Sequence, residues 1–242
     1  AVGMAVAERQ LAARFNRQEN SIIDHFTYVF AGDGCLMEGV SHEACSLAGT
    51  LGLGRLIVFY DANGISIDGK IDAWFSDNTA ERFRAYDWHV IEAVDGHDAK
   101  AIAEAIKAAR SETTRPTLLI CHTVIGYGSE AEGSETVHGA PLGADDIAQL
   151  RRRFNWPYAP FEIPDTLRDA WSHVKAGALE EDAWLKQLYA YESHYPEAYH
   201  ELLRVSNGDL PDTWSAISGI FIEQCRLGQK ALATRKASQQ CL

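Results

Sequence analysis

Apolar and amphipathic stretches alternate over the first half of the chain. Four short runs are apolar or β-branched, and they comprise residues 27–31, 55–60, 88–94 and 117–121. Between them the apolar positions have helical spacing, near residues 41–50, 78–86 and 98–111. Because strands that alternate with helices are typical of a parallel sheet with helices on both faces, we predict an α/β fold for this half.

The second half of the chain has a different pattern. Residues 126–144 are rich in Gly, Ser and Glu and predict a long loop, which in a compact domain is usually functional or disordered. A short helix is predicted over residues 145–154, and three prolines then interrupt the chain between residues 157 and 164. From residue 166 to 230 the pattern is helical again, which indicates a helical linker region.

We therefore expect three parts: an α/β domain over residues 1–157, the helical linker region over residues 158–234, and the start of a second domain over residues 235–242. The chain opens at Ala1 without a methionine, and Val2 and Ala5 are already in helical register. Its last residues read as the start of another helix. Both ends look cut, so we expect a piece of a longer protein whose N-terminal part is missing.

Composition and charge argue against membrane and nucleic-acid partners. No apolar run approaches the ~20 residues that cross a bilayer, and no secretory signal opens the chain. The 34 acidic and 22 basic residues give a net charge of −12, which repels nucleic acid and anionic membranes. The five cysteines are odd in number and form no CxxC pair, so the reducing cytoplasm is the expected setting.

A carboxylate between two glycines follows the first predicted strand. Gly32, Asp33 and Gly34 come directly after residues 27–31, and ligands of open α/β sheets bind beyond the carboxyl ends of the strands. The glycines let the backbone come close to a ligand. An aspartate beside a phosphate repels it unless a cation lies between them, and Mg²⁺ commonly binds a carboxylate together with phosphates.

A second polar turn follows the next predicted strand. Asn63 comes 30 residues after Asp33, about the length of a parallel strand–helix–strand unit. The two motifs are therefore expected at one sheet edge, on adjacent or nearly adjacent strands. The Asn63 side-chain oxygen and the Ile65 carbonyl can then bind the same ion as Asp33. An Asp-Gly pair alone is common turn chemistry, and only the combination of both motifs favours a metal–diphosphate site.

Four segments resemble the transketolase family in its bacterial and plant form. They are residues 32–43 (GDGCLMEGVSHE), 61–69 (DANGISIDG), 95–98 (DGHD) and 137–143 (VHGAPLG). Their order and spacing match that family along nearly the whole chain. Other thiamine-diphosphate enzymes, such as deoxyxylulose-phosphate synthase, are similar only in the first of these segments.

The resemblance implies a cofactor and the residues that hold it. Asp33, Asn63 and the carbonyl of Ile65 are expected to bind Mg²⁺ or Ca²⁺. Gly34 and Asn63 are expected to contact the diphosphate of thiamine diphosphate. The implied fold is the thiamine-diphosphate-binding α/β fold, a parallel sheet flanked by helices.

Other residues match family positions and also have simpler explanations. His138 matches a histidine near the cofactor and the sugar, which makes it a catalytic, cofactor-binding and substrate-binding candidate, but a lone histidine in a glycine-rich loop is often only exposed. Arg235 matches the arginine that binds the substrate phosphate, or is an ordinary arginine at a helix start. Glu38 and Glu43 match glutamates near a dimer interface, or are acids favoured at helix N-termini. We interpret His97 as a turn-stabilising residue rather than a catalyst.

As a transketolase, the protein would transfer a two-carbon ketol unit from a ketose phosphate to an aldose phosphate, in the pentose phosphate pathway. The resemblance implies a homodimer with sites between subunits, and an activating glutamate in a pyrimidine-binding domain that would follow Leu242. The chain alone is therefore expected to be inactive. The alternatives are a non-catalytic module that keeps only metal–diphosphate affinity, and a split subunit with a partner chain.

Overall fold

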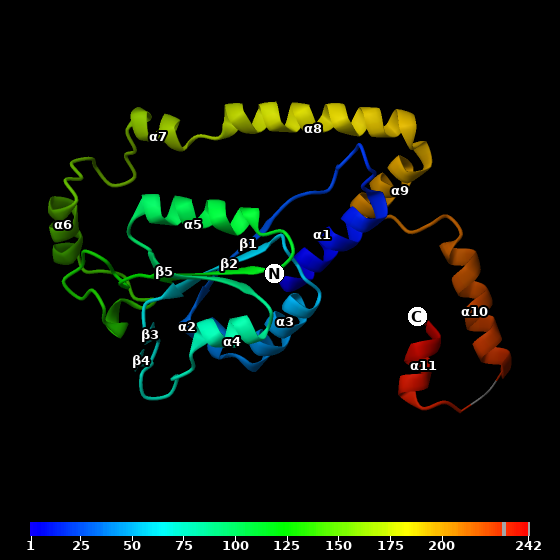
Figure 1. The fold of residues 1–242 in the computed structure, drawn as a ribbon, viewed down its shortest axis with the longest axis horizontal. Helices are drawn as coiled ribbons and strands as arrows, with labels where there is room; N and C mark the ends of the chain where they lie inside the picture. The colour runs from blue at the N-terminus through cyan, green and yellow to red at the C-terminus, as the bar shows by residue number, and fades with distance from the viewer. Residues whose placement is uncertain (229–230, 242) are drawn as a thin grey trace. The chain divides into compact units, whose positions relative to one another are not determined.

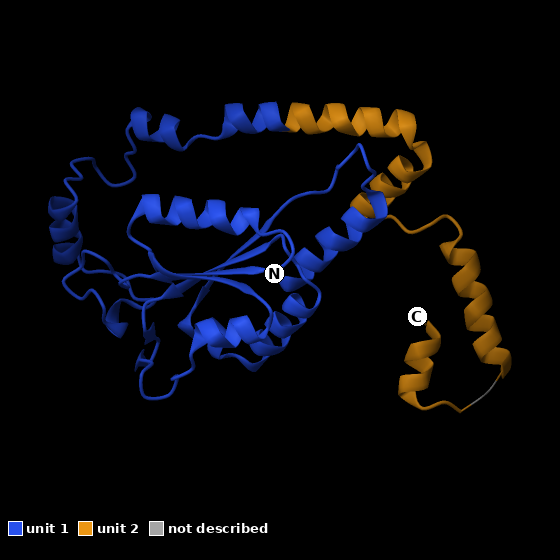
Figure 2. Cartoon of the chain, viewed as in Figure 1, with its two compact units in different colours: residues 1–180 blue, residues 181–242 orange. Residues whose placement is uncertain are grey.

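The computed structural model describes residues 1–228 and 231–241. The chain forms two compact units, residues 1–180 and residues 181–242, which Figure 2 shows in blue and orange. The first unit contains the sheet and both predicted ligand motifs, and the described part of the second unit is helical. No helix of the described residues is long and apolar enough to cross a membrane.

A four-stranded parallel sheet with the order β1-β2-β6-β5 forms the centre of the first unit (Figure 1). Its strands are β1 (Thr27–Gly32), β2 (Leu56–Ala62), β6 (Thr117–His122) and β5 (His89–Asp95). The four predicted apolar runs coincide with these strands to within two residues. The predicted parallel sheet is therefore confirmed.

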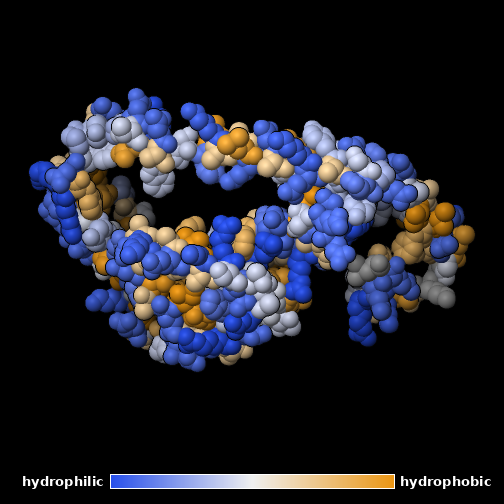
Figure 3. Space-filling view, turned by 45° about the horizontal axis from the view of Figure 1, so that its top comes forward, coloured by the Kyte–Doolittle hydropathy of each residue, from blue (hydrophilic) through white to orange (hydrophobic). Residues whose placement is uncertain are grey.

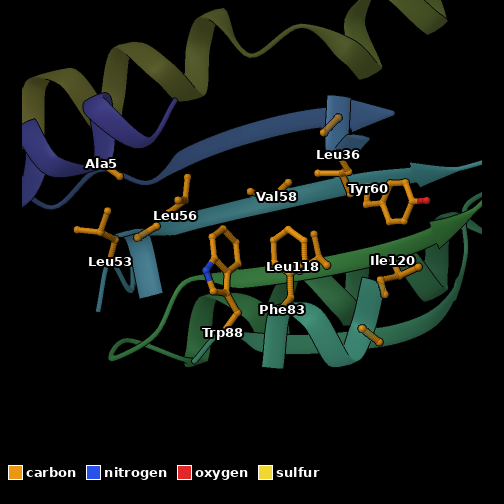
Figure 4. Close-up of a cluster of buried hydrophobic side chains, with 13 residues drawn as sticks. Ala5, Leu36, Leu53, Leu56, Val58, Tyr60, Phe83, Trp88, Leu118 and Ile120 are labelled. Atoms are coloured by element: carbon orange, nitrogen blue, oxygen red, sulfur yellow. The ribbon is translucent and has the colours of Figure 1, made fainter. Parts of the chain in front are cut away.

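Helices cover both faces of the sheet, because successive side chains of a strand point to opposite faces. On one face Leu56, Val58 and Tyr60 of β2 lie in a core cluster with residues of four helices (Figure 4). These helices are α1 (Val2–Phe15), α2 (Asp33–Met37), α3 (Gly39–Thr50) and α4 (Thr79–Ala85). On the other face Ile57 and Phe59 pack with α5 (Ala99–Ser111). Both faces of β2 are buried, which explains its uninterrupted apolar sequence.

Several short elements lie inside segments that the sequence predicts as turns or loops. They are α2 (Asp33–Met37), the antiparallel pair β3 (Ile65–Ser66) and β4 (Gly69–Lys70), and the 3₁₀ turn η1 (Glu135–Val137). Each is too short to show a periodic pattern of apolar residues. Two of them, α2 and the β3–β4 pair, begin at the predicted ligand motifs and so give these motifs a fixed conformation.

The other regular elements of the described residues are helices. They are α6 (Ala144–Arg153), α7 (Asp165–Trp171), α8 (Val174–His194), α9 (Pro196–Asn207), α10 (Trp214–Gly228) and α11 (Thr234–Cys241). This agrees with the predicted helical region and completes the predicted fold class, a parallel sheet flanked by helices and followed by helices. The predicted domain boundaries at residues 157 and 234 stay predictions.

The edge strand β1 carries exposed apolar side chains. Among the described residues it pairs only with β2, and the Phe30 side chain is 80% exposed although its ring stacks on Phe59 at 5.0 Å. Val40 at the start of α3 is 68% exposed. Such hydrophobic residues form the orange areas of the surface in Figure 3.

Close backbone contact between α3 and the turn after α4 leads to a prediction about stability. A Cβ at Gly49 would lie 1.6 Å from the carbonyl oxygen of Tyr86. Gly49→Ala is therefore expected to lower the free energy of unfolding by about 1–3 kcal/mol, as overpacking of a core does. Urea denaturation followed by circular dichroism measures this change.

Gly3→Ala in α1 is the matched control, since a Cβ there meets no described heavy atom within 4 Å. It is expected to leave the urea midpoint unchanged or to raise it slightly, because alanine favours helix over glycine by about 1 kcal/mol. Equal midpoints for both variants would contradict the close packing of α3.

Candidate functional site

The two predicted motifs meet at the carboxyl edge of the sheet. Gly32 at the end of β1 is in register with Asp61 near the end of β2. Asp33 follows as the first residue of α2, and only 2% of it is exposed. One of its carboxylate oxygens, Oδ2, accepts a hydrogen bond from the backbone N–H of Gly64 at 3.0 Å. The predicted proximity of the motifs is thus present in the structure.

The turn after β2 is held by the side chain of Asn63. Its Oδ1 accepts a hydrogen bond from the backbone N–H of Ile65 at 3.0 Å, which is the geometry of an Asx turn. Gly64 between them has a φ of 72°, a conformation that glycine adopts without strain. This turn leads directly into the β3–β4 pair and fixes the segment that contains the predicted ligands Asn63 and Ile65.

Open space adjoins these groups. A Cβ at Gly32, Gly34 or Gly64 would meet no described heavy atom within 4 Å, and Gly34 is exposed. A bulky anion can therefore come close to the backbone here. The predicted oxygen ligands and the adjoining space fit a hard divalent cation together with a diphosphate.

Asp61 links the ends of two neighbouring strands. Its Oδ1 accepts a hydrogen bond from the Thr123 hydroxyl, just after β6. Its Oδ2 accepts one from the Nδ2 group of Asn63 at 3.3 Å. Since Asn63 is also held by Ile65, these contacts fix both ends of its side-chain amide.

The His138 loop, which we define as residues 123–143 between β6 and α6, begins at the same edge. The N-terminal and C-terminal halves of the loop pack together. The N–H of Gly133 donates a hydrogen bond to the carbonyl of Ile125 at 2.8 Å. A Cβ at Gly126 would lie 2.7 Å from the Val137 side chain, which shows how closely these two residues approach. Val137 precedes His138, which is exposed and follows η1. The loop therefore returns His138 towards the strand end where the loop started.

Polar contacts to α6 hold the His138 loop. The Ser129 hydroxyl donates to Asp146 Oδ2 at 2.5 Å, and the N–H of Glu130 donates to Asp146 Oδ1 at 3.1 Å. Glu132 Oε2 accepts the N–H of Gly128 at 2.7 Å and lies 3.4 Å from a guanidinium nitrogen of Arg153. The segment predicted to be functional or disordered is thus an ordered loop.

His97 contacts the N-terminal half of the His138 loop. Its Nε2 accepts a hydrogen bond from the backbone N–H of Val124 at 2.9 Å, and its ring stacks on Tyr127 at 4.1 Å. The N–H of His97 donates to Asp95 Oδ1 at 2.9 Å. These contacts agree with the interpretation of His97 as a turn-stabilising residue.

Comparison with known proteins identifies the family. A sequence model described as "Transketolase, thiamine diphosphate binding domain" matches residues 1–211. The chain belongs to the transketolase family. It is 55% identical over its whole length to transketolase 1 of Pasteurella multocida, and 51% identical to transketolase 2 of Escherichia coli. In both cases it spans 36% of the relative's length.

Solved transketolases share the fold. The transketolase of Pichia stipitis in complex with sedoheptulose-7-phosphate has a TM-score of 0.85 and 45% identity, over 88% of this chain and 32% of that one. The transketolase of Leishmania mexicana has a TM-score of 0.86 and 41% identity, over 89% of this chain and 32% of that one. The chain thus corresponds to about a third of a transketolase and matches the family's thiamine diphosphate-binding domain.

The predicted residues differ in how the structure places them. Asp33, Asn63 and Ile65 lie together, and His138 lies in the loop that starts at the same edge. Arg235 is the second residue of α11 and belongs to the second unit. The roles of all these residues stay predictions.

The predicted metal ligands are not a cluster of acids. Among the described residues no group of three or more His, Cys, Asp and Glu side chains could hold a metal ion. The predicted set has one carboxylate, one amide and one main-chain carbonyl. It therefore fits a hard cation that shares its coordination with phosphate oxygens and water.

The sequence analysis missed the groups that orient these ligands. Tyr60, Asp61 and Thr123 hydrogen-bond the predicted ligands or one another. A tyrosine hydroxyl and an aspartate near the end of an otherwise apolar strand were the available signal in the sequence. Their partners, however, lie on other segments of the chain.

A separate cleft of about 630 Å³ lies at the opposite edge of the sheet. It is lined by residues that precede β2 and β6, including Arg55 and Thr114, and by Glu8 and Arg9 of α1. The buried Glu8 carboxylate has a raised pKa because of desolvation, and it lies 3.4 Å from Arg55 Nε. This cleft is remote from the turns that follow the strands, where parallel sheets bind ligands.

The anchoring of the His138 loop leads to a prediction. Asp146→Ala removes the acceptor for two loop hydrogen bonds, and such bonds to a charged group contribute about 1.5–3 kcal/mol each. We expect the loop to open more often and limited proteolysis within residues 123–143 to become about 10-fold faster or more. Mass spectrometry of the first cleavage products measures the rate.

The neighbouring Asp145 provides the control for this experiment. It is exposed in the same first turn of α6, so Asp145→Ala removes the same charge near the helix N-terminus. Its cleavage rate should equal that of the wild type. Equal rates for both variants would show that Asp146 does not hold the loop.

Proposed function

We propose that this chain supplies the metal–diphosphate anchor of a transketolase. The whole enzyme transfers a two-carbon ketol unit from a ketose phosphate to an aldose phosphate in the pentose phosphate pathway. The observation that carries the proposal is the hydrogen bond of 3.0 Å between Gly64 N–H and Asp33 Oδ2, which brings the two motifs together beside open glycine backbone. Structures of related transketolases in complex with sugar phosphates support the substrate class.

Mg²⁺ or Ca²⁺ is the proposed link between chain and cofactor. Asp33, Asn63 Oδ1 and the Ile65 carbonyl are the proposed protein ligands, and Gly34 and Asn63 also contact the diphosphate. The buried carboxylate of Asp33 would repel a diphosphate without a cation between them. When bound, thiamine diphosphate supplies the stabilised carbanion for the reaction. The chain's residues hold and orient its diphosphate end.

His138 and Arg235 are the proposed substrate-facing residues. The exposed imidazole of His138, held in an ordered loop at the sheet edge, can donate or accept a proton near the reacting sugar. Arg235 has the planar guanidinium that suits bidentate binding of the substrate phosphate. We also propose a cytoplasmic homodimer, with the exposed Glu38 and Glu43 near the subunit interface. On this proposal the chain alone is inactive.

Asp33 provides the direct test of the anchor. Asp33→Ala is expected to abolish Mg²⁺-dependent binding of thiamine diphosphate, because it removes the one charged ligand. Isothermal titration of thiamine diphosphate into the complete enzyme that contains this sequence, with and without Mg²⁺, measures the effect. Asp24 is an exposed aspartate that precedes the N-terminal end of β1, far from the site. The variant Asp24→Ala is therefore the control and should bind thiamine diphosphate as the wild type does. Unchanged binding by Asp33→Ala would exclude Asp33 as a ligand.

His138 is tested by turnover in the complete enzyme that contains this sequence. His138→Ala is expected to lower kcat by about 10²-fold or more, the lower end for a general acid–base group. His25→Ala, an exposed histidine before β1, should leave kcat unchanged. A kcat near the wild-type value for His138→Ala would leave this histidine without a catalytic role.

A further inference from the structure

Helix α2, which begins with Asp33, is held at its other end by the two helices beside it. It has only five residues, and so short a helix gains little from its own hydrogen bonds and leaves its last carbonyls without intrahelical partners. The Cys35 carbonyl accepts a hydrogen bond from the Ser41 hydroxyl of α3 at 2.5 Å. The Leu36 carbonyl accepts one from Arg82 Nη2 of α4 at 3.3 Å. The C-terminal end of α2 is therefore fixed from outside.

Several further contacts hold the guanidinium of Arg82 in place. Its Nη1 donates to Asp77 Oδ2 at 2.7 Å and to His42 Nε2 at 3.2 Å. Only 12% of the Arg82 side chain is exposed, and the guanidinium lies 5.5 Å from the ring centroid of Phe75 and 5.6 Å from that of Phe83. The planar fork of an arginine makes such contacts in several fixed directions at once, which a lysine ammonium does not.

His42 is an acceptor in this arrangement. An arginine has donors only, so Nε2 of His42 is unprotonated and its Nδ1 carries the ring proton. This Nδ1 donates a hydrogen bond to the Tyr86 hydroxyl at 3.1 Å. Because Tyr86 is the C-cap residue of α4, His42 joins α3 to α4 at Arg82 and at the end of the helix. The helix that carries Arg82 is therefore fixed as well.

Local stability is a poor explanation for a charged residue at this position. The Nε group of Arg82 is buried and has no hydrogen-bond partner among the described residues. A buried donor without a partner is unfavourable, and an apolar side chain between two phenylalanine rings would avoid that cost. What an apolar side chain does not provide is a donor to the Leu36 carbonyl.

The charge of Arg82 also acts beside the predicted metal ligand. Burial and the Asp33 carboxylate raise the pKa of the Tyr60 hydroxyl above its usual range, and the positive charge of Arg82 opposes this shift. The same hydroxyl donates a hydrogen bond to Asp33 Oδ1. Arg82 is therefore linked to the site through the end of α2 and through its charge.

We propose that Arg82 is a positioning residue for the diphosphate anchor: by holding the C-terminal end of α2, it fixes the direction in which this helix presents Asp33 and Gly34. The inference rests on the proposed function, because it presumes that these two residues bind the metal ion and the diphosphate. Tyr60 and Gly64 hold α2 at Asp33. Arg82 supplies a second fixed point, and two points are needed to set the direction of a helix.

The test measures cofactor affinity and turnover separately, in the complete enzyme that contains this sequence. Arg82→Met removes the fork and the charge but keeps an unbranched side chain. Isothermal titration of thiamine diphosphate into the cofactor-free enzyme, with Mg²⁺ present, should give a dissociation constant about 10- to 100-fold above that of the wild type, as the loss of an orienting partner does at metal sites. Turnover at saturating thiamine diphosphate should stay close to the wild-type value, because no reacting group is changed.

Arg84→Met is the matched control on the same helix. Arg84 is exposed and pairs with Glu81 and Glu92, so this variant should bind thiamine diphosphate as the wild type does. Arg82→Lys keeps the charge without the fork and should weaken binding nearly as much as Arg82→Met. Wild-type affinity in Arg82→Lys would show that the charge alone acts and would overturn the proposal.

A purely structural role of Arg82 predicts a different result. Arg82→Met would then reduce the folded fraction and the turnover per total protein, while the folded molecules would bind thiamine diphosphate with an unchanged dissociation constant. That outcome would also overturn the proposal. Circular dichroism measures the folded fraction.

Asp77→Asn is a milder change in case Arg82→Met does not fold. It removes the charge that pairs with Arg82 from a side chain that is 46% exposed, and it should raise the dissociation constant by a smaller factor. An unchanged constant in folded Asp77→Asn would then count against the proposal. The proposed function fails in a different way, namely if Asp33→Ala leaves Mg²⁺-dependent binding of thiamine diphosphate unchanged.

Discussion

The parallel register between β1 and β2 is the constraint on which the site depends. It pairs Ala31 with Tyr60 and Gly32 with Asp61, so both strands end at the same level. Asp33 then lies one residue beyond its strand and beside the turn that follows the other. A shift by one residue would turn Tyr60 to the opposite face, among the residues that pack on α5. The alternating core contacts of β2 therefore fix the position of the Asp33 carboxylate as well as the sheet.

Burial of Asp33 would be strongly unfavourable without these partners. An isolated carboxylate loses its hydration in a protein interior, and such a loss is tolerated only when hydrogen bonds or ions compensate it. Here Tyr60 and Gly64 donate to the two oxygens. The same contacts that make the buried carboxylate acceptable also decide its orientation. Stability and ligand geometry thus depend on the same few atoms.

The sequence alone predicts those parts of the structure that show a local pattern of residues. The apolar runs predict all four strands of the sheet, and the spacing between Asp33 and Asn63 predicts that the two motifs share an edge. It was not sufficient for contacts made across the chain. Three hydrogen bonds illustrate this: Tyr60 to Asp33, Thr123 to Asp61, and Ser129 of the His138 loop to Asp146. Each joins residues that no periodic sequence pattern relates. Element α2 was missed because five residues are too few to show helical spacing.

The charge of the site explains why one carboxylate suffices. Asp33, Asp61 and Asp95 all lie at the carboxyl edge of the sheet, in a chain with a net charge of −12, so a bare diphosphate is repelled there. In the proposed site a divalent ion meets one charged ligand, Asp33, and two neutral oxygens from Asn63 and Ile65. The bound ion therefore keeps a net positive charge and attracts the diphosphate. A cluster of three acids would more than neutralise the charge of the ion and remove that attraction. A site that binds a diphosphate through a cation therefore contains fewer acidic ligands than a site that binds the cation alone.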